Sequence, residues 1–467
     1  MRVDEYIEYD GVGLSELIRD GEVEAPEIAE AARSAISSVS ELNALAFPLF
    51  EEAIPYAAGP LAGVPFLMKD DGPFAAGYPF TVGSRLLRGA VADRDSIVTA
   101  RARATGLAIL GATAAPEFCI SFATDSALNG PTRNPWDPGL GAGGSSGGSA
   151  ALVAARAVPW AHASDGAGSI RVPSAACGVV GFKPSRGRVP VGPYSLEAGF
   201  GVTGHFAITR TLRDVAALLD ALAGDAPGEK YRVPAPHDPY SGEVGRDSGP
   251  LRIAVSPAGW YGTEVNGESR ALACGIAAAL ERRDRIVEEV TPAFRDEDIL
   301  DAYVAVTRLG LAGAVPVAAD LGLLEAATRA FVLEARQTPL ADAARGFDAF
   351  NTVAREAGAF FERYDLLITP TLAREPIPHG TLDYDDPGHT GRSWMAAIFE
   401  YGPFTSAFNL GGQPAVSLPL GTSSGGLPLG VQLVAAQGRE DLLIRVAAEL
   451  EARIPWAGKA PVIVASG

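Results

Sequence analysis

The chain has 467 residues, of which 47% are hydrophobic and 20% are charged. A chain of this length and apolar content buries a large core, which excludes an intrinsically disordered polymer. Its 56 acidic residues outnumber the 38 basic ones, the formal net charge is -18, and no run of Lys and Arg offsets it. Because this charge repels phosphate backbones and anionic lipid surfaces, we expect neither nucleic acid nor a membrane as a partner.

The N-terminal segment MRVDEYIEYDGVGLSELIRD carries acids where a secretory or transit peptide carries bases, and it lacks a central apolar block. No later apolar run reaches the roughly 20 residues of a membrane span. The three cysteines, Cys119, Cys177 and Cys274, cannot all pair within one chain and do not form a metal-ligand cluster. These features favour a reduced, cytoplasmic protein without a metal site.

Helices are the expected elements of the first part of the chain, over about residues 1–60. Pro26 suits the first turn of a helix, because its missing N–H group would have no partner there in any case. It is followed by Ile28, Ala31, Ala32 and Ala35, whose spacing places their side chains on one helix face. The sequence therefore predicts a helix that begins near Pro26.

The pattern changes over about residues 61–224. Apolar runs at 61–68 and 107–110 alternate with Gly-rich turns and with a helix-like stretch at 95–105. This alternation is typical of strands separated by helices, and so of an α/β fold. A helix is also predicted over 211–222, where Thr211 and Asp214 form a capping-box pair and Gly224 follows the last turn.

Residues 225–250 are rich in Pro, Gly and charge, which indicates an exposed excursion or a linker. Apolar runs resume at 251–255, 286–290 and 366–369, and the runs at 415–420 and 429–434 flank a Ser/Gly turn that indicates a hairpin or two neighbouring strands. A final helix is expected at 440–451. We therefore predict one domain over 1–467, with a core over about 61–224 that continues over about 251–467.

The most unusual segment holds two Ser/Gly clusters, GAGGSSGGSA at 141–150 and SDGAGSIR at 164–171. A flexible linker is one interpretation, but the first cluster leads directly into an apolar, helix-like stretch at 150–158. A phosphate cradle at a helix N-terminus is another. Because the P-loop pattern ends in Gly-Lys-Ser/Thr and this run ends in Gly147, Gly148 and Ser149, nucleotide binding is disfavoured.

A third interpretation is a nucleophile elbow, since Gly143, Ser145 and Gly147 satisfy the G-x-S-x-G pattern. Such an elbow needs an acid and a later histidine. The candidates do not differ in their sequence context, and they are His205, His237, His379 and His389. The histidine of an elbow therefore stays unassigned.

Lys69 is an alternative base. It ends the apolar run Val64–Met68, which has the composition of a buried strand, and burial of an ammonium group favours the neutral amine that can act as a general base. The competing interpretation places Lys69 just beyond the strand end, where it points to solvent or pairs with Asp70 or Asp71.

Several long segments, taken in order, resemble the amidase signature family of serine hydrolases over nearly the whole chain. They are GVPFLMKD around Lys69, TRNPWDP at 132–138, GGSSGGS at 143–149, SDGAGSIRVPSAACGVVGFKPSRGR at 164–188, FNLGGQPAVSLPLG and GLPLGVQLVAA. Within that family, TRNPWDPGLGAGGSSGGSAALVAA and PWAHASDGAGSIR are most similar to nylon-oligomer (aminohexanoate cyclic dimer) hydrolases. The resemblance implies a mixed central β-sheet covered on both faces by α-helices.

The resemblance also implies a Ser, Ser, Lys triad. Ser169 would be the nucleophile, Ser145 the bridging serine, held through a cis peptide, and Lys69 the base. The backbone N–H groups of Gly166, Ala167, Gly168 and Ser169 would form the oxyanion hole. The implied reaction is hydrolysis of a carboxamide through an acyl-enzyme, with no metal and no organic cofactor.

Further roles follow from the same resemblance. Cys119, Ile120 and Ser121 correspond to the substrate-facing segment, with an ordinary buried thiol as the other interpretation of Cys119. Asp165 and Arg171 are expected to pair with each other or with the backbone as supports. The chain departs from the family in having Ala112 and Ala114 where Lys and Asn are usual, and Ala167 where Gly is usual.

The leading hypothesis is an amidohydrolase that acts on a small or oligomeric amide of low charge. The alternatives are a glutamine-hydrolysing subunit of a tRNA-dependent amidotransferase, and a non-catalytic binding homologue. The expected partner is the small-molecule amide itself, and a homodimer is left open. Trp394, Phe399, Phe404 and Phe408 either line the pocket or, as their helix-like spacing favours, pack in the core.

Overall fold

The computed structural model describes residues 1–72, 74–193, 197–456 and 459–467. The strands of its main sheet are β5 (Trp160–Asp165), β6 (Val180–Lys183), β7 (Gly204–Thr209), β8 (Leu251–Val255), β9 (Arg285–Glu289), β10 (Leu366–Pro370), β11 (Ala415–Thr422) and β12 (Pro428–Ala435). Their order across the sheet is β5-β7-β6-β11-β12-β10-β8-β9. Neighbours among β10, β8 and β9 are parallel and the other neighbours are antiparallel, so the sheet is mixed.

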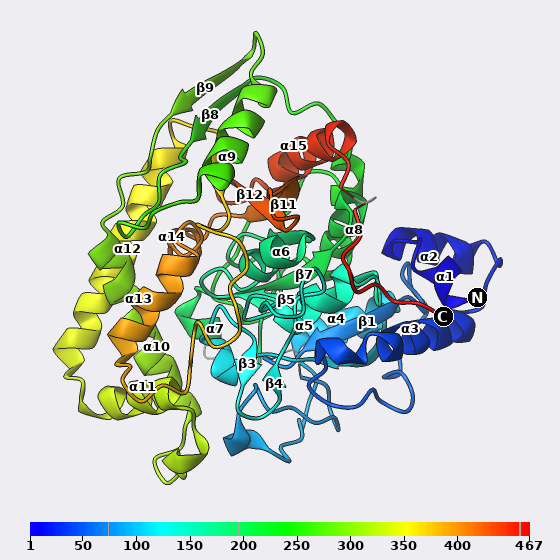
Figure 1. Ribbon diagram of the computed structural model, residues 1–467, viewed down its shortest axis with the longest axis horizontal. Coiled ribbons are helices and arrows are strands. Elements are labelled where there is room, and N and C mark those ends of the chain that lie inside the picture. Colours follow the sequence, from blue (N-terminus) through cyan, green and yellow to red (C-terminus); the bar gives the residue numbers. More distant parts are fainter. Residues whose placement is uncertain (73, 194–196, 457–458) are drawn as a thin grey trace.

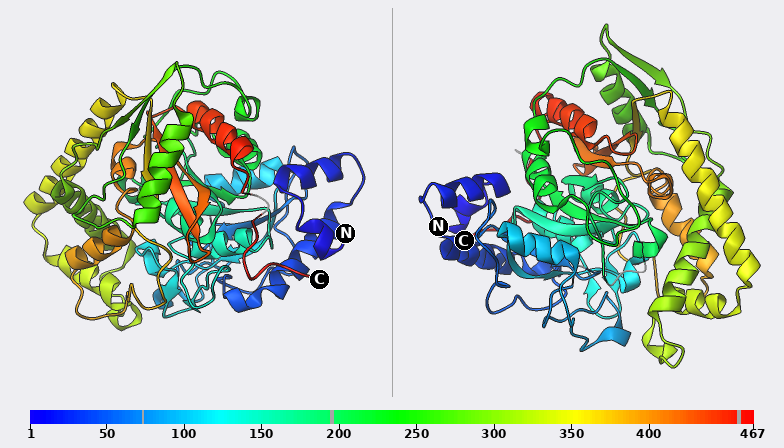
Figure 2. Two further views of the ribbon diagram at one scale, coloured as in Figure 1. Left: turned by 45° about the horizontal axis from the view of Figure 1, so that its top comes forward. Right: turned by 180° about the vertical axis from the view of Figure 1, so that it is seen from behind.

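Helices cover both faces of this sheet (Figures 1 and 2). They include α5 (Gly147–Ala154), α6 (Arg171–Cys177), α8 (Leu212–Leu222), α9 (Gly267–Leu280), α14 (Ala407–Gly411) and α15 (Glu440–Arg453). Helix α6 packs on β6, β11 and β12, whereas α8 packs on β7 and α9 packs on β8 and β10. The predicted mixed sheet between helical layers is therefore confirmed.

Two helical regions lie at opposite ends of the molecule (Figures 1 and 2). One end holds α1 (Val3–Tyr6), α2 (Gly11–Arg19) and α3 (Ala25–Ser38), and the other holds α10 (Asp296–Ala314), α11 (Ala326–Gln337), α12 (Leu340–Phe361) and α13 (Gly391–Tyr401). Smaller elements are α4 (Ile97–Thr105), α7 (Glu197–Phe200), the parallel pair β1 (Pro65–Lys69) and β2 (Ala108–Thr113), and the pair β3 (Asp125–Ser126) and β4 (Gly130–Pro131). Among the described residues, we find no helix that is both long and apolar enough to cross a bilayer.

Most predicted elements are present, with shifted ends. The helix near Pro26 is α3, and the apolar runs at 415–420 and 429–434 form the antiparallel pair β11 and β12. The strand predicted from 61 begins only at Pro65, and the helix predicted over 150–158 spans 147–154 instead. The early start of α5 is possible because Gly148 has no Cβ, which would lie 2.5 Å from the Ala44 carbonyl oxygen.

The segment 225–250 contains no strand and only a short 3-10 turn, Tyr240–Glu243. Strands from both sides of this segment share the main sheet, which agrees with a single core.

The capping pair that precedes α8 forms only in part. The Thr211 hydroxyl accepts the Asp214 N–H, but the Asp214 carboxylate accepts the backbone N–H groups of Gly11 and Val12, so it ties the N-terminal helices to the core.

Candidate active site

A cavity of about 280 Å³ lies where the loops after β1, β2 and β5 face helices α10 and α13. Ser145 and Ser169 both line it, and so do Cys119, Ile120 and Ser121. The structure thus brings together residues from three of the segments that the sequence singles out.

Lys69 is the last residue of β1, and the whole strand is buried. Its side chain is 0% exposed, and Nζ lies 2.7 Å from Ser145 Oγ. Of the two interpretations of Lys69, the solvent-directed one is wrong. The pairing with Asp71 is present as well, since Nζ lies 3.1 Å from Asp71 Oδ2.

Ser145 precedes α5, and the Gly144–Ser145 peptide bond is cis, as the resemblance implied. Its neighbour Ser146 turns away from the cavity, because its hydroxyl donates to the Ser164 carbonyl. The backbone N–H groups of Ser146 and Gly147 bind Ser169 O and Thr124 Oγ1, so neither is available for an anion. A phosphate cradle is therefore not formed here.

The turn that carries Ser169, residues 166–169, has all four of its carbonyl groups bound by other parts of the protein. Thr405 Oγ1 donates to Ala167 O at 2.6 Å, Val172 N donates to Gly168 O at 2.7 Å, and Ser146 N donates to Ser169 O at 3.2 Å. The Tyr303 hydroxyl lies 2.8 Å from Gly166 O. We call residues 166–169 the nucleophile turn, because Ser169 is the nucleophile that the resemblance predicts.

These bonds also orient the N–H groups of the nucleophile turn. In a planar trans peptide the N–H points opposite to the preceding C=O. The N–H groups of Ala167, Gly168 and Ser169 therefore point away from the donors that hold the carbonyls, and none has an acceptor among the described residues. Gly168 allows this conformation, with φ +150° and no Cβ where the Thr405 hydroxyl lies. The turn has the geometry expected of an oxyanion hole.

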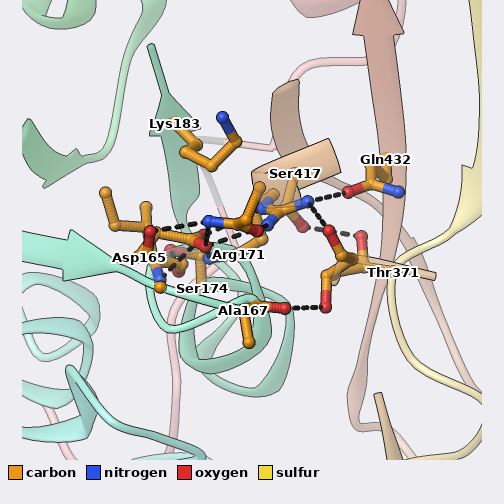
Figure 3. Close-up of polar contacts among 12 residues, drawn as sticks. Asp165, Ala167, Arg171, Ser174, Lys183, Thr371, Ser417 and Gln432 are labelled. Atoms are coloured by element: carbon orange, nitrogen blue, oxygen red, sulfur yellow. Dashed lines mark hydrogen bonds and ion pairs between the residues drawn. The ribbon is translucent and has the colours of Figure 1, made fainter. Parts of the chain in front are cut away.

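A buried ion pair is formed by the residues that flank the nucleophile turn in the sequence. Arg171, the first residue of α6, and Asp165, the last of β5, are both 0% exposed and are joined at 2.9 Å, which confirms their predicted pairing. Figure 3 shows Arg171 lying between Asp165 and Gln432, whose Oε1 accepts from Nη1 at 2.6 Å. Arg171 also donates to the backbone oxygen of Thr405 at 2.9 Å, and to Asn409. Each polar atom of the pair thus has a partner, as a buried charge requires.

The opposite side of the cavity is a face of α10. Val306, Thr307, Gly310, Leu311 and Ala314 line the cavity at the spacing of one helix face, and we call them the α10 wall. Met395 and Ile398 of α13 adjoin it. The Thr307 hydroxyl has no hydrogen-bond partner among the described residues, and the rest of the wall is apolar. No Lys or Arg is among the described residues that line the cavity.

The segment before the first Ser/Gly cluster forms a third side. Phe118 and Cys119 have positive φ values of 48° and 59°, and Phe118 N donates to the carbonyl of Val82, whose φ is 50°. Such conformations are costly for residues with a Cβ, and they bring these three side chains to the cavity. Burial raises the pKa of Cys119 to about 12, so its thiol stays protonated and serves as a wall atom and not as a nucleophile.

Sequence reasoning missed several residues of the site. Ser164 lies on β5, two residues after His162. Its hydroxyl accepts a hydrogen bond from Lys69 Nζ at 2.9 Å and donates one to Asp71 Oδ2. His162 and His205 lie side by side on β5 and β7, 3.2 Å apart between Nε2 and Nδ1. The two histidines belong to no local motif, whereas Ser164 is the first residue of the second Ser/Gly cluster. The available signal was the alternation of His162 and Ser164 on one strand, together with two acids directly after Lys69.

The departures from the family pattern have identifiable places. Ala112 lies beside the site, on a small cavity that Lys69 and Asp71 also line, and Ala114 is buried behind it. Ala167 lies on the cavity wall. The aromatic residues Trp394, Phe399, Phe404 and Phe408 are fully buried and do not line the cavity, so the core-packing interpretation holds.

Comparison with known proteins agrees with this architecture. The Amidase family matches residues 27–444. A 6-aminohexanoate-cyclic-dimer hydrolase of Paenarthrobacter ureafaciens is 37% identical over 481 residues, which cover 97% of each chain. An acylamidase of Rhodococcus erythropolis is 35% identical over 415 residues, which cover 86% of this chain and 84% of that protein. The solved structure of a 6-aminohexanoate cyclic dimer hydrolase complexed with substrate superposes with a TM-score of 0.91 at 35% identity, covering 98% of this chain and 99% of that one.

The likeness extends over nearly the full length of each chain and includes the segments that build the cavity. The chain belongs to the amidase signature family and is an amidohydrolase.

Proposed function

We propose that this protein hydrolyses the C–N bond of a small or oligomeric carboxamide of low charge, with Ser169 as nucleophile, Ser145 as the bridging serine and Lys69 as base. The observation that carries the proposal is the 2.7 Å contact of Lys69 Nζ with Ser145 Oγ, on a cavity that Ser169 also lines. The relatives named 6-aminohexanoate-cyclic-dimer hydrolase make a cyclic or linear aminohexanoate amide the first substrate to test.

The proposed reaction begins with a relay of protons. Neutral Lys69 takes the proton of the Ser145 hydroxyl as Ser145 takes the proton of Ser169, and Ser169 Oγ then bonds to the amide carbonyl carbon. The carbonyl oxygen gains negative charge, which the N–H groups of the nucleophile turn stabilise. These donors cost no reorganisation, because their peptide planes are already fixed by Tyr303, Thr405 and the two backbone donors.

Collapse of this intermediate breaks the C–N bond. The proton held on Lys69 returns through Ser145 to the departing nitrogen, so an amine leaves and an amide anion is avoided. Water then attacks the acyl-enzyme and gives its proton to the same relay, which releases the carboxylic acid and restores Ser169. No step of this sequence requires a metal or an organic cofactor.

The cavity supports a substrate of low charge. Its α10 wall is apolar, and its described lining includes no cation that would pair with a carboxylate. Free glutamine also carries a carboxylate, and burial in this cavity would leave that group without a cationic partner among the described lining residues. The amidotransferase alternative is for this reason less well supported, and the filled triad positions argue against a binding homologue without activity.

The test combines covalent labelling with a substrate screen. A fluorophosphonate should label the purified protein, and Ser169→Ala should abolish labelling and lower turnover by more than about 10³-fold. Cyclic amides, linear aminohexanoate oligomers, aryl amides and free glutamine should be compared as substrates. Labelling that persists in Ser169→Ala would overturn the assignment of the nucleophile, and ammonia release from glutamine only with partner subunits would support the amidotransferase.

The role of Lys69 predicts the direction of the pH dependence. Activity should rise with pH as Lys69 loses its proton, because only the neutral amine accepts one. Lys69→Ala should remove this rise together with most of the turnover. A variant that keeps full turnover and an unchanged pH profile would contradict the assignment of the base.

A further inference from the structure

Two histidines and a carboxylate lie around Lys69, and the proposed relay does not use them. His162 is on β5, His205 is on β7 and Asp71 follows β1, and one donor atom of each lies within 4.8 Å of the other two. The histidines are buried, and the Asp71 side chain is 4% exposed. Because burial of titratable groups is costly, a cluster of three beside the proposed base calls for a function.

The hydrogen bonds of the cluster fix its protons. The backbone N–H of Lys69 donates to His162 Nδ1 at 3.4 Å, so this nitrogen carries no proton. The neutral ring then carries its proton on Nε2, which lies 3.2 Å from His205 Nδ1. His205 Nδ1 is accordingly the acceptor, and the His205 proton is on Nε2. Burial lowers the pKa of His162 to about 3 and also lowers that of His205, so both rings are neutral at pH 7.

The same proton order disfavours a metal ion between the three side chains. His162 would have to give up its Nε2 proton while Nδ1 still accepts a main-chain N–H. A metal would also stand beside the Lys69 amine, which already lies 3.1 Å from Asp71 Oδ2. The arrangement is a chain of oriented donors that starts at the backbone of Lys69 and leads to the neighbourhood of Asp71.

Asp71 is held against Lys69 by three further contacts. Its backbone N–H donates to Lys69 O at 2.8 Å, and this tight turn brings the carboxylate back to the amine of the same strand end. The Ser164 hydroxyl donates to Asp71 Oδ2 and accepts from Lys69 Nζ, so it joins the two groups a second time. Asp71 Oδ1 is buried without a hydrogen-bond partner, which leaves its charge poorly compensated except by Lys69.

We propose that Asp71 is a positioning residue that sets the proton affinity of Lys69, and that neutral His205, oriented by His162, keeps the charge of Asp71 directed at the amine. This inference rests on the proposed function, because it assumes that Lys69 exchanges the proton of Ser145. When the O–H bond of Ser145 breaks and an N–H bond forms on Lys69, the new ammonium lies next to a buried carboxylate. Asp71 therefore makes Lys69 a stronger base and raises the pH at which the base is free.

Asp71 is ionised while Lys69 carries its proton. Burial favours its neutral form, but the charge of Lys69, the largest opposing influence, holds the pKa of Asp71 below its usual range. The proton therefore remains on Lys69 until it returns through Ser145, and Asp71 neither gains nor loses one.

The other titratable groups near Lys69 are accounted for. Those that face it from the elements packed around it are Asp70, Asp71, Cys119, His162 and His205. Cys119 and the histidines are uncharged at pH 7. The Asp70 carboxylate accepts the N–H groups of Thr81 and Gly83 and the Thr81 hydroxyl, so it anchors that loop and does not contact the amine. Asp71 is thus the charged group in direct contact with Lys69.

The test uses the full chain and the rate of labelling by a fluorophosphonate as a function of pH, because labelling reports activation of the nucleophile without knowledge of the substrate. Asp71→Asn should move the acidic limb of this profile to lower pH by about one unit or more, since the uncharged amide no longer favours the ammonium. The plateau rate should fall. Asp71→Ser removes the same charge through a smaller side chain and should shift the limb in the same direction.

Two further variants make the test specific. His205→Leu should shift the limb by a smaller amount toward lower pH, because His205 then no longer keeps the Asp71 charge directed at the amine, and His205→Gln should restore much of the parent profile. Asp70→Asn is the matched control, because Asp70 is the acid directly before Asp71 and does not contact the amine. The acidic limb of the Asp70→Asn labelling profile should stay at the parent pH, whatever the plateau rate of this variant.

The outcomes separate this inference from the proposed function. The role of Asp71 would be overturned if the pH profiles of Asp71→Asn and Asp71→Ser superimposed on the parent profile. If Lys69→Ala were unlabelled in the same experiment, the proposed triad would still stand. Labelling of Lys69→Ala at the parent rate would instead overturn the triad itself. A shift of the same size in Asp70→Asn would show that the profile responds to any nearby charge, which would also overturn the specific role of Asp71.

Discussion

The two sides of the cavity are built in opposite ways. On the side of the nucleophile turn, every carbonyl has a donor, and Arg171 donates to four residues, Asp165, Thr405, Asn409 and Gln432. On the α10 wall, the only polar side chain, Thr307, has no partner among the described residues. Hydrogen bonds thus fix the orientation of the peptide planes in the nucleophile turn, whereas the α10 wall only limits the space that a substrate can occupy.

This difference indicates which side of the cavity would stabilise charge and which would select the substrate. Stabilisation of a developing charge depends on donors that are already oriented, so it belongs to the rigid side. Selection among amides of different size depends on the shape of an apolar surface, so it belongs to α10 and α13. Substitutions on the two sides should therefore affect kcat and substrate preference separately, and four variants test this from the largest expected effect to the smallest.

Arg171→Met should have the largest effect. Removal of the cation leaves Asp165 as an uncompensated charge in a fully buried position, which typically costs about 3–5 kcal/mol of folding stability. Urea denaturation of the purified proteins measures the loss. Arg2→Met, which removes an exposed Arg paired with Asp4, is the control and should leave the unfolding midpoint unchanged. Equal midpoints for Arg171→Met and the parent would contradict the account of a supporting ion pair.

Thr405→Val should lower kcat by about 10-fold with little change in KM, since loss of one oxyanion donor costs about 10²-fold or more and this change only loosens one. Valine keeps the shape of threonine but cannot donate to Ala167 O. Steady-state kinetics give the comparison, with Thr352→Val as a control, because that hydroxyl bonds only within α12. A rise in KM at constant kcat would place Thr405 in substrate binding and break the division between the two sides.

Gly310→Leu should change substrate preference more than kcat. A Cβ at this position meets nothing within 4 Å, so the added side chain extends into open space on the α10 wall. The value of kcat/KM should fall for a cyclic amide and stay near the parent value for a short aryl acetamide. Gly358→Leu is the matched control, an exposed helical glycine of α12 with equally open surroundings. Both changes replace a helical glycine, so neither should lower the melting temperature.

The smallest expected effect is at Glu325, which is not among the described residues that line the cavity. Glu325 precedes α11 and accepts the Ala127 N–H at 3.1 Å, and burial raises its pKa to about 8. A carboxyl whose pKa is raised in the folded state stabilises the fold fully below its unfolded pKa, and this contribution is lost as pH rises toward 8. The melting temperature should therefore fall between pH 5 and pH 8, and Glu325→Gln should fall less over the same range. An identical slope in the variant would show that Glu325 is not buried as described.

Local signals in the sequence predict an α/β fold and several elements, whereas the mixed sheet between helical layers was implied by the family resemblance. The apolar run that ends at Lys69, the hairpin of β11 and β12 and the helix α3 follow from periodicity and turn composition. Helix ends are less accurate, since close packing decides them, as Gly148 against Ala44 illustrates. The candidate triad residues come from a resemblance to long motifs and not from spacing alone.

The rest of the site depends on contacts between distant segments. His205 meets His162 only because β5 and β7 pair antiparallel with Ser164 opposite His205. Tyr303 and Thr405 reach the nucleophile turn from helical regions more than a hundred residues further along the chain. Asp71 lies two residues after Lys69 in the sequence. From the sequence, burial of Lys69 and pairing of Lys69 with Asp71 were competing interpretations, but in the structure Lys69 is both buried and paired.

The dependence of the nucleophile turn on Thr405 and Gln432 has a consequence for how the protein becomes active during synthesis. A nascent chain that has emerged only to the end of α12 already contains residues 69, 145 and 169, but it lacks Thr405, which holds Ala167 O, and Gln432, which binds the Arg171 guanidinium together with Asp165. The peptide planes of residues 166–169 would then lack one of their donors. We therefore expect the proposed oxyanion site to be complete only after β12 has joined the sheet.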